Sequence, residues 1–274
     1  MFTVMKREIK LGFRNAWTYS FLILFTLFTS GLLLLQASTS NVEGYTDMAG
    51  TVMNMTLYLL PLITLLLGSF SITSEKEDGH WALLVTYPIS SFSFLVGKWL
   101  GLAITLLTIV IFSFGFSGIL MTLFNQMIAI QTFLLLLVFA LLLALAFLSI
   151  AFLIGAIAKN RWHALIWTIG VWFIFIISWP LIIISLLSLL PSYQMIQPTL
   201  QFVTILNPAE LIRIFTMMRL GAGSAFGAEY DAWITWATSN SGLIIFIVVF
   251  LSIIIVTLFI SSLLWKRGEQ YGTS

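Results

Sequence analysis

The chain alternates between long apolar stretches and short polar connections. Six stretches are long enough to cross a hydrocarbon core of about 30 Å, which takes about 20 helical residues. These predicted spans are residues 18–37, 51–73, 99–124, 128–157, 163–190 and 242–265. Since no sequence repeat or polar linker divides them, we expect an all-α integral membrane protein in which residues 1–274 form a single transmembrane domain.

The residues before the first span carry two interleaved patterns. Apolar side chains recur at helical spacing at Phe2, Met5, Ile9, Phe13 and Ala16. Basic side chains recur every four residues on another side, at Lys6, Lys10 and Arg14. This pattern predicts that residues 1–17 form an amphipathic helix in the headgroup layer. The alternative is a solvated leader to the first span.

Composition and charge fix the class of protein and its orientation. With 60% hydrophobic residues and a mean hydropathy of +1.09, the chain has too little polar surface for a soluble globule. Ten of the 12 Lys and Arg residues fall on one side of a six-span protein. Short cytoplasmic loops retain basic residues, so we expect both termini to be cytoplasmic and the protein to lie in the cytoplasmic (inner) membrane. The basic residues are scattered, which gives no indication of nucleic-acid binding.

The sequence lacks the residues that ion-coupling, hydrolytic and phosphate-binding sites require. None of the predicted spans has Asp, Glu, Lys or Arg in its interior, which argues against an ion-coupled secondary transporter. No HExxH motif or membrane-depth carboxylate pair is present, and Phe92 and Trp99 replace the residues that a phosphate-binding loop around Gly97 and Lys98 needs. We therefore expect a non-catalytic chain that binds no cofactor itself. If transport is energised, the energy must come from another polypeptide.

Methionines raise the question of a copper site. Five of them fall on the predicted outer side: Met48, Met53, Met55, Met217 and Met218. Thioethers bind Cu(I), but no His accompanies these residues and the chain has no Cys. Methionine is also ordinary filling in an apolar helix. We predict no metal site.

Four adjacent charges, Glu75 to Asp78, interrupt this apolar chain after the second span. Gly79 follows, and then an amphipathic piece with Trp81, Leu84 and Val85 at i, i+3 and i+4, which Pro88 ends. The segment predicts a rigid knob that projects from the second span and docks into a groove on a soluble partner. The alternative is a solvated loop whose aromatic part lies flat on the lipid.

The long connection at 191–241 predicts two short helices that lie in or on the outer leaflet. The first has Asn207 as N-cap, Pro208 at its first position, Glu210 three residues after the cap and Gly221 as terminator. The second covers residues 228–240. Small residues four apart, at Gly97 and Gly101 and at Ala140 and Ala144, indicate close helix contacts.

Three segments carry a resemblance to a known family: "SEKEDG" after the second span, "YPIS" and "FLVGKWLG" before the third, and "ILNPAEL" at 205–211. Together with the order of parts, they resemble the permease subunits of type-2 ABC exporters, and within that family the NosY-like copper-processing permeases. The resemblance implies that residues 1–17 are an elbow helix and that residues 74–98 contain a cytoplasmic coupling helix. It also implies a re-entrant helix pair at 191–241.

The resemblance also implies partners and residue roles. The family's permeases work as homodimers with two copies of an ABC ATPase, which binds ATP and Mg. Residues expected to dock the ATPase are Glu75, Glu77, Asp78, Gly79, His80, Trp81 and Leu84. Residues expected at an outer gate are Asn207, Pro208, Glu210 and Arg213. Membrane lipids surround the spans.

Two functions follow from this resemblance. The first is export of a substrate across the membrane, driven by ATP hydrolysis in the partner ATPase. The second is a mechanical or maturation device that passes ATP-driven motion to an extracytoplasmic protein through residues 191–241, as in assembly of the copper site of nitrous oxide reductase. The neighbouring genes discriminate between these two functions.

Overall fold

The computed structural model describes residues 1–37, 47–79, 90–124, 129–190, 195–222 and 231–271. These residues form helices and short connections, with no strand among them. The elements are α1 (Phe2–Gly12), α2 (Ala16–Ala37), α3 (Asp47–Glu77), α5 (Ser91–Leu123), α6 (Ile130–Ile157), α7 (Arg161–Trp172), the π-helix η1 (Phe173–Ser178), α8 (Trp179–Ser188), α9 (Ile196–Leu206), α10 (Pro208–Arg219), α11 (Asp231–Thr238) and α12 (Asn240–Tyr271).

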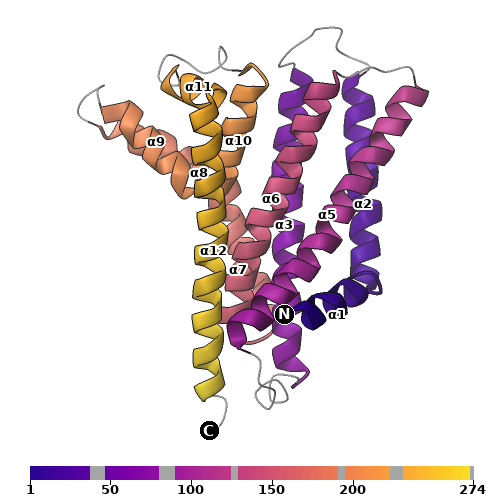
Figure 1. Cartoon of the computed structure of the whole chain (residues 1–274). Helices are drawn as coiled ribbons and strands as arrows, with labels where there is room; N and C mark the ends of the chain where they lie inside the picture. Colours follow the sequence, from indigo (N-terminus) through magenta and orange to yellow (C-terminus); the bar gives the residue numbers. More distant parts are fainter. Residues whose placement is uncertain (38–46, 80–89, 125–128, 191–194, 223–230, 272–274) are drawn as a thin grey trace.

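Six helical runs among the described residues are long and apolar enough to cross a membrane. They are Ala16–Leu34, Ala49–Glu77, Ser91–Leu123, Ile130–Ile157, Arg161–Ser188 and Asn240–Trp265, which confirms the prediction of six spans. The two chain ends lie at the same end of the bundle (Figure 1). We call this the inner end, because the charge pattern predicts that it is cytoplasmic, and we call the opposite end the outer end.

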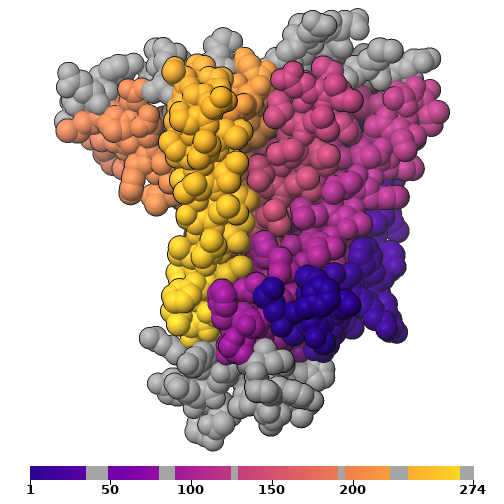
Figure 2. Space-filling view, in the orientation of Figure 1, coloured from indigo at the N-terminus to yellow at the C-terminus, as the bar shows by residue number. Residues whose placement is uncertain are grey.

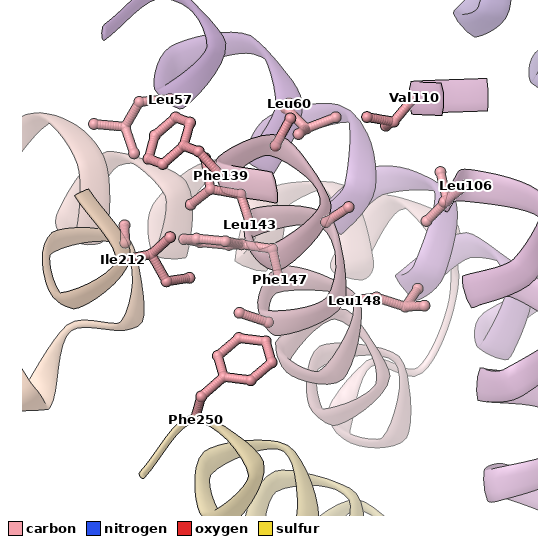
Figure 3. Close-up of a cluster of buried hydrophobic side chains, with 14 of the residues drawn as sticks. Leu57, Leu60, Leu106, Val110, Phe139, Leu143, Phe147, Leu148, Ile212 and Phe250 are labelled. Carbon is pink, nitrogen blue, oxygen red and sulfur yellow. The ribbon is translucent and has the colours of Figure 1, made fainter. Parts of the chain in front are cut away.

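Helix α6 forms the centre of the bundle. It packs against α3, α5, α10 and α12, and Phe139, Leu143, Phe147 and Leu148 on it are almost completely buried. Figure 3 shows these side chains among residues from the surrounding helices, including Leu60 of α3. An α6 without a charged residue can be enclosed on several sides because the backbone groups between its two ends bond within the helix.

Small residues bring α3 and α6 into close contact. A Cβ added at Gly68 would lie 2.6 Å from the Cβ of Ala151, and one at Gly155 would lie 2.6 Å from the Cβ of Ile72. Such approaches let helices pack tightly in a membrane, where no hydrophobic effect draws them together. The absence of a Cβ at these two glycines therefore allows the close approach of the central helix pair.

Hydroxyl groups join α2 to α5 in a similar way. Thr26 and Ser113 share a hydrogen bond of 2.8 Å, and Thr29 and Ser117 share one of 3.0 Å; all four side chains are buried. Hydrogen bonds between membrane helices contribute roughly 0.6 kcal/mol each on average. The polar residues of these spans thus serve helix packing.

Helix α1 lies across the inner half of α5 (Figures 1 and 2). Gly97 and Gly101 of α5 form the contact surface: an added Cβ would lie 2.7 Å from the carbonyl oxygen of Met1 and 2.6 Å from the Cβ of Glu8, respectively. The spacing of these two glycines did indicate a close helix contact, and its partner is α1 of the same chain.

The connection between the second and third spans is shorter than expected. Helix α3 continues to Glu77 and α5 begins at Ser91, capped by the hydroxyl of Ser90. Lys98 therefore lies inside α5 and is 2% exposed, whereas the sequence had placed it in the connection before the third span. The sequence analysis placed Lys98 at the end of a loop because the carboxylates that compensate its charge are far away along the chain.

The fifth span consists of three parts and is followed by α9, which the sequence did not predict. Pro198 occupies the first turn of α9, where proline is tolerated. Helices α8 and α9 lean away from the rest of the bundle at the outer end (Figures 1 and 2). Helix α10, in contrast, is almost wholly buried.

Candidate functional site

The last turn of α3 carries three consecutive charged residues, Glu75, Lys76 and Glu77, that contact different parts of the bundle. We call these three residues and their partners the charged cluster. Residues at successive positions of a helix point about 100° apart, so a run of three reaches neighbours on most sides of α3.

Glu75 forms a buried ionic group with residues of α1 and α5. The Nζ of Lys98 lies 2.9 Å from Oε1 of Glu75 and 3.0 Å from Oε2 of Glu8, and the three side chains are 3–8% exposed. Ser71 donates a hydrogen bond of 2.8 Å to the other carboxylate oxygen of Glu8. Because removal of one partner from such a group leaves a buried charge uncompensated, this contact holds α1, α3 and α5 together.

Lys76 caps the C-terminus of α6. Its Nζ donates to the carbonyl oxygens of Gly155, Ala156 and Ala158 at 3.0, 2.8 and 2.8 Å. The last carbonyls of a helix have no partner within it and carry partial negative charge, which a lysine there satisfies. The ammonium also lies 5.4 Å from the ring centroid of Trp265 in α12. Lys76 thus joins α3 to α6 and α12.

Glu77 binds the first turn of α7. Its Oε1 accepts the backbone N–H of Arg161 at 2.8 Å, and its Oε2 lies 2.9 Å from Nε of the same residue. Asn160 caps the helix by accepting the N–H of His163 at 2.8 Å. A carboxylate at a helix N-terminus interacts favourably with the free N–H groups and the dipole. The charged cluster therefore connects α3 to α1, α5, α6, α7 and α12.

The predicted docking residues divide into two sets. Glu75 is buried inside the bundle, whereas Glu77, Asp78 and Gly79 are exposed at the inner end. Gly79 has a φ of +68°, the left-handed conformation with which glycine ends a helix. His80, Trp81 and Leu84 lie outside the described residues. Among the described docking residues, Glu77, Asp78 and Gly79 are the ones placed to contact another protein directly.

Sequence reasoning did not assign Glu8 and Lys98 to the charged cluster. It also did not find that Lys76 points into the bundle. The available signal was Lys98 itself, because a lysine between glycines and apolar residues needs a carboxylate nearby. It did not identify which carboxylate, since Glu8 is 90 residues away in the sequence.

A second group of predicted residues lies near the outer end. Asn207 is fully buried, and its Oδ1 accepts the N–H of Ala209 at 2.9 Å, which confirms the predicted N-cap of α10. Its Nδ2 donates to the carbonyl oxygen of Phe175 in η1 at 2.7 Å. π-Helical segments are rare and occur often at functional sites. Asn207 therefore ties the start of α10 to the irregular segment of the fifth span.

The other predicted outer residues belong to the same helix. Pro208 occupies the first position of α10, as expected. Glu210 and Arg213 pair at 2.6 Å on one face, with 7% and 22% of their side chains exposed. Gly221 has a φ of +82°, which confirms it as a terminator. Whether these residues gate an exit stays a prediction.

The described part of the chain contains no candidate metal site of His, Asp or Glu side chains. Among those residues, no group of three or more His, Asp or Glu side chains is placed to hold an ion. Met53, Met217 and Met218 are instead members of the apolar core. Their packing role is the one expected of methionine in an apolar helix.

Comparison with known proteins covers nearly the whole chain. Residues 2–267 match the family described as ABC-2 family transporter protein. A "Probable ABC transporter permease protein NosY" from Pseudomonas aeruginosa is 30% identical over 239 residues, which is 83% of this chain and 85% of that protein. The protein of the same description from Stutzerimonas stutzeri is 28% identical over 236 residues, with the same coverage. The matched region includes both the charged cluster and α10.

Proposed function

Because this chain belongs to the ABC-2 family of transporter proteins and is the permease subunit of an ABC transporter, we propose that a separate ATPase subunit drives it by ATP hydrolysis. The ATPase binds ATP and Mg at the inner end and exports a substrate across the cytoplasmic membrane through this chain. Two copies of each subunit form the complex, as the family resemblance implies. The chain itself supplies the path and the coupling contacts.

One observation carries this proposal: successive charged residues at the end of α3 bind separate neighbouring helices. Residues 80–89 follow directly, and we propose that they dock into the ATPase together with Glu77, Asp78 and Gly79. A displacement of this segment moves the end of α3. The charged cluster then transmits the movement to α1, α5, α6 and α7 as one unit, which tilts the second and third spans.

Burial changes the role that we propose for Glu75. A residue 5% exposed within the chain cannot contact the ATPase without unfolding its surroundings. Glu75 acts as part of the transmission, and Asp78, which is exposed, acts at the docking surface. Asp78→Lys should therefore weaken ATPase binding at unchanged thermal stability, whereas Glu75→Lys should lower the stability of the permease itself.

A second candidate function has a feature of the fold in its favour. Helices α8 and α9 project at the outer end (Figure 1), where they are available to an extracytoplasmic protein. The resemblance to NosY-like copper-processing permeases supports a device that passes movement to such a partner. Co-purification of an extracytoplasmic protein that is lost when residues 196–206 are replaced would favour this function over export.

The experiment that tests the docking proposal replaces residues 80–87 by a Gly/Ser linker of equal length. We expect normal membrane insertion and loss of co-purification with the ATPase, because α3 ends before the replaced segment and no member of the charged cluster lies within it. Replacement of residues 39–46 at the other end of α3 is the matched control and should leave co-purification intact. Retention of the ATPase by the 80–87 variant would show that docking occurs elsewhere.

A further inference from the structure

The second and fifth spans each contain an irregular position near the middle of their length. Pro61 lies inside α3, where it supplies no N–H to the carbonyl oxygen of Leu57 and its ring presses against that carbonyl. The fifth span changes from α-helix to the π-helix η1 at Phe173 and back to α-helix at Trp179. Sharp bends in helices occur at prolines and at π-helical turns. Each span therefore has a position at which its angle can change.

Two contacts fasten α3 to α7 on the inner side of these positions. At the inner end, Glu77 binds the backbone N–H and the guanidinium of Arg161. About two turns further out, the hydroxyls of Ser69 and Thr168 share a hydrogen bond of 3.2 Å, and both side chains are completely buried. These parts of the two helices form a unit that we call the inner helix pair: residues 62–77 of α3 and 161–172 of α7.

A third contact crosses the proline. The indole N–H of Trp172, the last residue of α7, donates to the carbonyl oxygen of Tyr58 at 2.9 Å. Tyr58 precedes Pro61 in α3, whereas the other two contacts follow it, so α7 holds α3 on both sides of the proline. Trp172 also directly precedes η1. One hydrogen bond therefore joins the two irregular positions.

The depth of this bond in the membrane makes it hard to replace. In the interior of a bilayer, a released indole N–H finds no water to bind. A donor left without an acceptor in an apolar medium costs more than the intact bond contributes. We therefore expect the bond between Trp172 and Tyr58 to persist while the helices move, so that the angles at Pro61 and at η1 change together.

A further hydrogen bond connects η1 to the outer end. Asn207 donates to the carbonyl oxygen of Phe175 in η1 at 2.7 Å and caps α10. Helix α10 in turn packs against α6, α9 and α11. A change of angle at η1 therefore displaces the start of α10 and acts on the helices around it.

We propose that Trp172 is a positioning residue that makes the second and fifth spans bend together. Displacement at the inner end moves the inner helix pair as a unit, and the bond to Tyr58 converts this movement into a joint change of angle at Pro61 and η1. Asn207 then passes the change to α10. The coupling is a property of the permease chain itself. Its use in a transport cycle rests on the ATP-driven function proposed above.

The test measures distances between pairs of spin labels by double electron–electron resonance on the full-length chain in nanodiscs. The chain has no cysteine, so labels attach only at introduced positions. Labelled chains are diluted with unlabelled chains, so that distances within one chain dominate. Met55→Cys with Ile184→Cys is the outer pair, and Asp78→Cys with Ile166→Cys is the inner pair; all four positions are exposed.

Trp172→Phe keeps an aromatic ring and removes the donor to Tyr58. We expect the distance distribution of the outer pair to widen by several ångströms. The inner pair should not change, because the contacts of Ser69 and Glu77 with α7 remain. Trp167→Phe, at a tryptophan 53% exposed in the same helix, is the matched control and should alter neither distribution. An unchanged outer pair in Trp172→Phe would overturn the proposal.

A second substitution shows whether the bond acts through the bend of α3. Pro61→Ala restores an N–H for the carbonyl oxygen of Leu57 and removes the ring, which stiffens the helix. In this background, Trp172→Phe should widen the outer-pair distribution much less than it does alone. Equal widening with and without the proline would contradict the proposal. If Trp172→Phe does not fold, Pro61→Ala alone should narrow the outer-pair distribution, and an unchanged distribution would count against the proposal.

The same labels in the complex with the ATPase separate this inference from the proposed function. ATP should shift the outer pair in the otherwise unmodified permease but not in Trp172→Phe, while co-purification of the ATPase is retained in both. An equal shift in the two proteins would overturn the role of Trp172. If ATP shifts no distance even in the otherwise unmodified permease, the ATP-driven function fails, and the measurements without ATP still decide whether Trp172 couples the two spans.

Discussion

At the scale of single residues, Lys98 has the most demanding surroundings in the described part of the chain. One ammonium serves two carboxylates from different helices, at 2.9 and 3.0 Å, in a site almost closed to solvent. Arg7 lies 3.9 Å from Glu75 at the edge of the group and is half exposed. With Arg7 the four formal charges cancel. Such a group contributes little net stability when complete but is costly to break, and it therefore specifies one arrangement of three helices.

Lys98→Met should destabilise the protein by about 3–5 kcal/mol, because Glu8 and Glu75 would remain buried with only the half-exposed Arg7 as counter-charge. We expect a lower apparent melting temperature in detergent and reduced yield of the folded permease. Lys159→Met, at an exposed lysine, is the matched control and should have little effect. Partial recovery in the double variant Lys98→Met/Glu8→Gln would confirm the electrostatic cause. A single variant that melts like the unmodified protein would contradict it.

Asn207 makes two hydrogen bonds, and two different substitutions distinguish their effects. Asn207→Ala removes both the N-cap, at a cost of about 0.5–2 kcal/mol, and the donor to Phe175, which leaves a buried carbonyl unsatisfied. Asn207→Asp keeps an acceptor for Ala209 and loses the donor to Phe175. We expect hydrogen exchange of the amides in η1 to accelerate in both variants, and that of α10 to accelerate only in the alanine variant. Unchanged exchange in η1 would show that the Phe175 contact does not stabilise the π-helical turn.

At the scale of elements, the contact of α1 with α5 depends on glycine. Gly101→Leu would place side-chain atoms where Glu8 now lies, since even a Cβ there would be 2.6 Å from its Cβ. We expect α1 to separate from α5, which faster hydrogen exchange across residues 2–12 would reveal, and ATP-driven activity to fall. Gly115→Leu in the same helix is the control, because an added Cβ there has no atom within 4 Å. Equal exchange in the two variants would mean that α1 is not held by this contact.

The apolar pattern was sufficient to predict the six spans, and cap residues were sufficient to predict the limits of α10. One missed feature originates in contacts between distant segments. Helix α5 extends back past Lys98 because two carboxylates from other helices compensate its charge. Helix α9 begins two residues before Pro198, in a turn where a missing N–H costs nothing. The π-helical turn leaves no mark in the sequence.

For the charged cluster, the sequence showed the run of charges but not the direction in which each side chain points. The run from Glu75 to Asp78 lies at the end of α3, where successive residues face different neighbours. Glu75 and Lys76 point to partners inside the bundle, and only Glu77 and Asp78 remain exposed. Adjacent charges look alike in a sequence, and their directions depend on which helices pack around them.

At the scale of the whole molecule, the two ends of the bundle are held in different ways. At the inner end, the charged cluster and the glycines of α5 bind most of the helices to one another. At the outer end, α8 and α9 lean away from the bundle beyond a π-helical turn (Figure 1). Force applied at the inner end would therefore move a connected body, while the outer part of the fifth span has room to change its angle. This arrangement suits a protein that is driven from the inner side and responds on the outer side.

The orientation of the bundle underlies both proposed functions, and the absence of cysteine makes it straightforward to measure. Asp78→Cys, beyond the last turn of α3, should react with a membrane-impermeant maleimide only after the cytoplasmic side is opened. Glu43→Cys, before the first turn of α3, should react in intact cells. Both substitutions lie outside the buried contacts of the charged cluster, so folded protein is expected in each case. Reaction of Asp78→Cys in intact cells would place the charged cluster on the outer face, where no cytosolic ATPase reaches it, and the coupling proposal would fail.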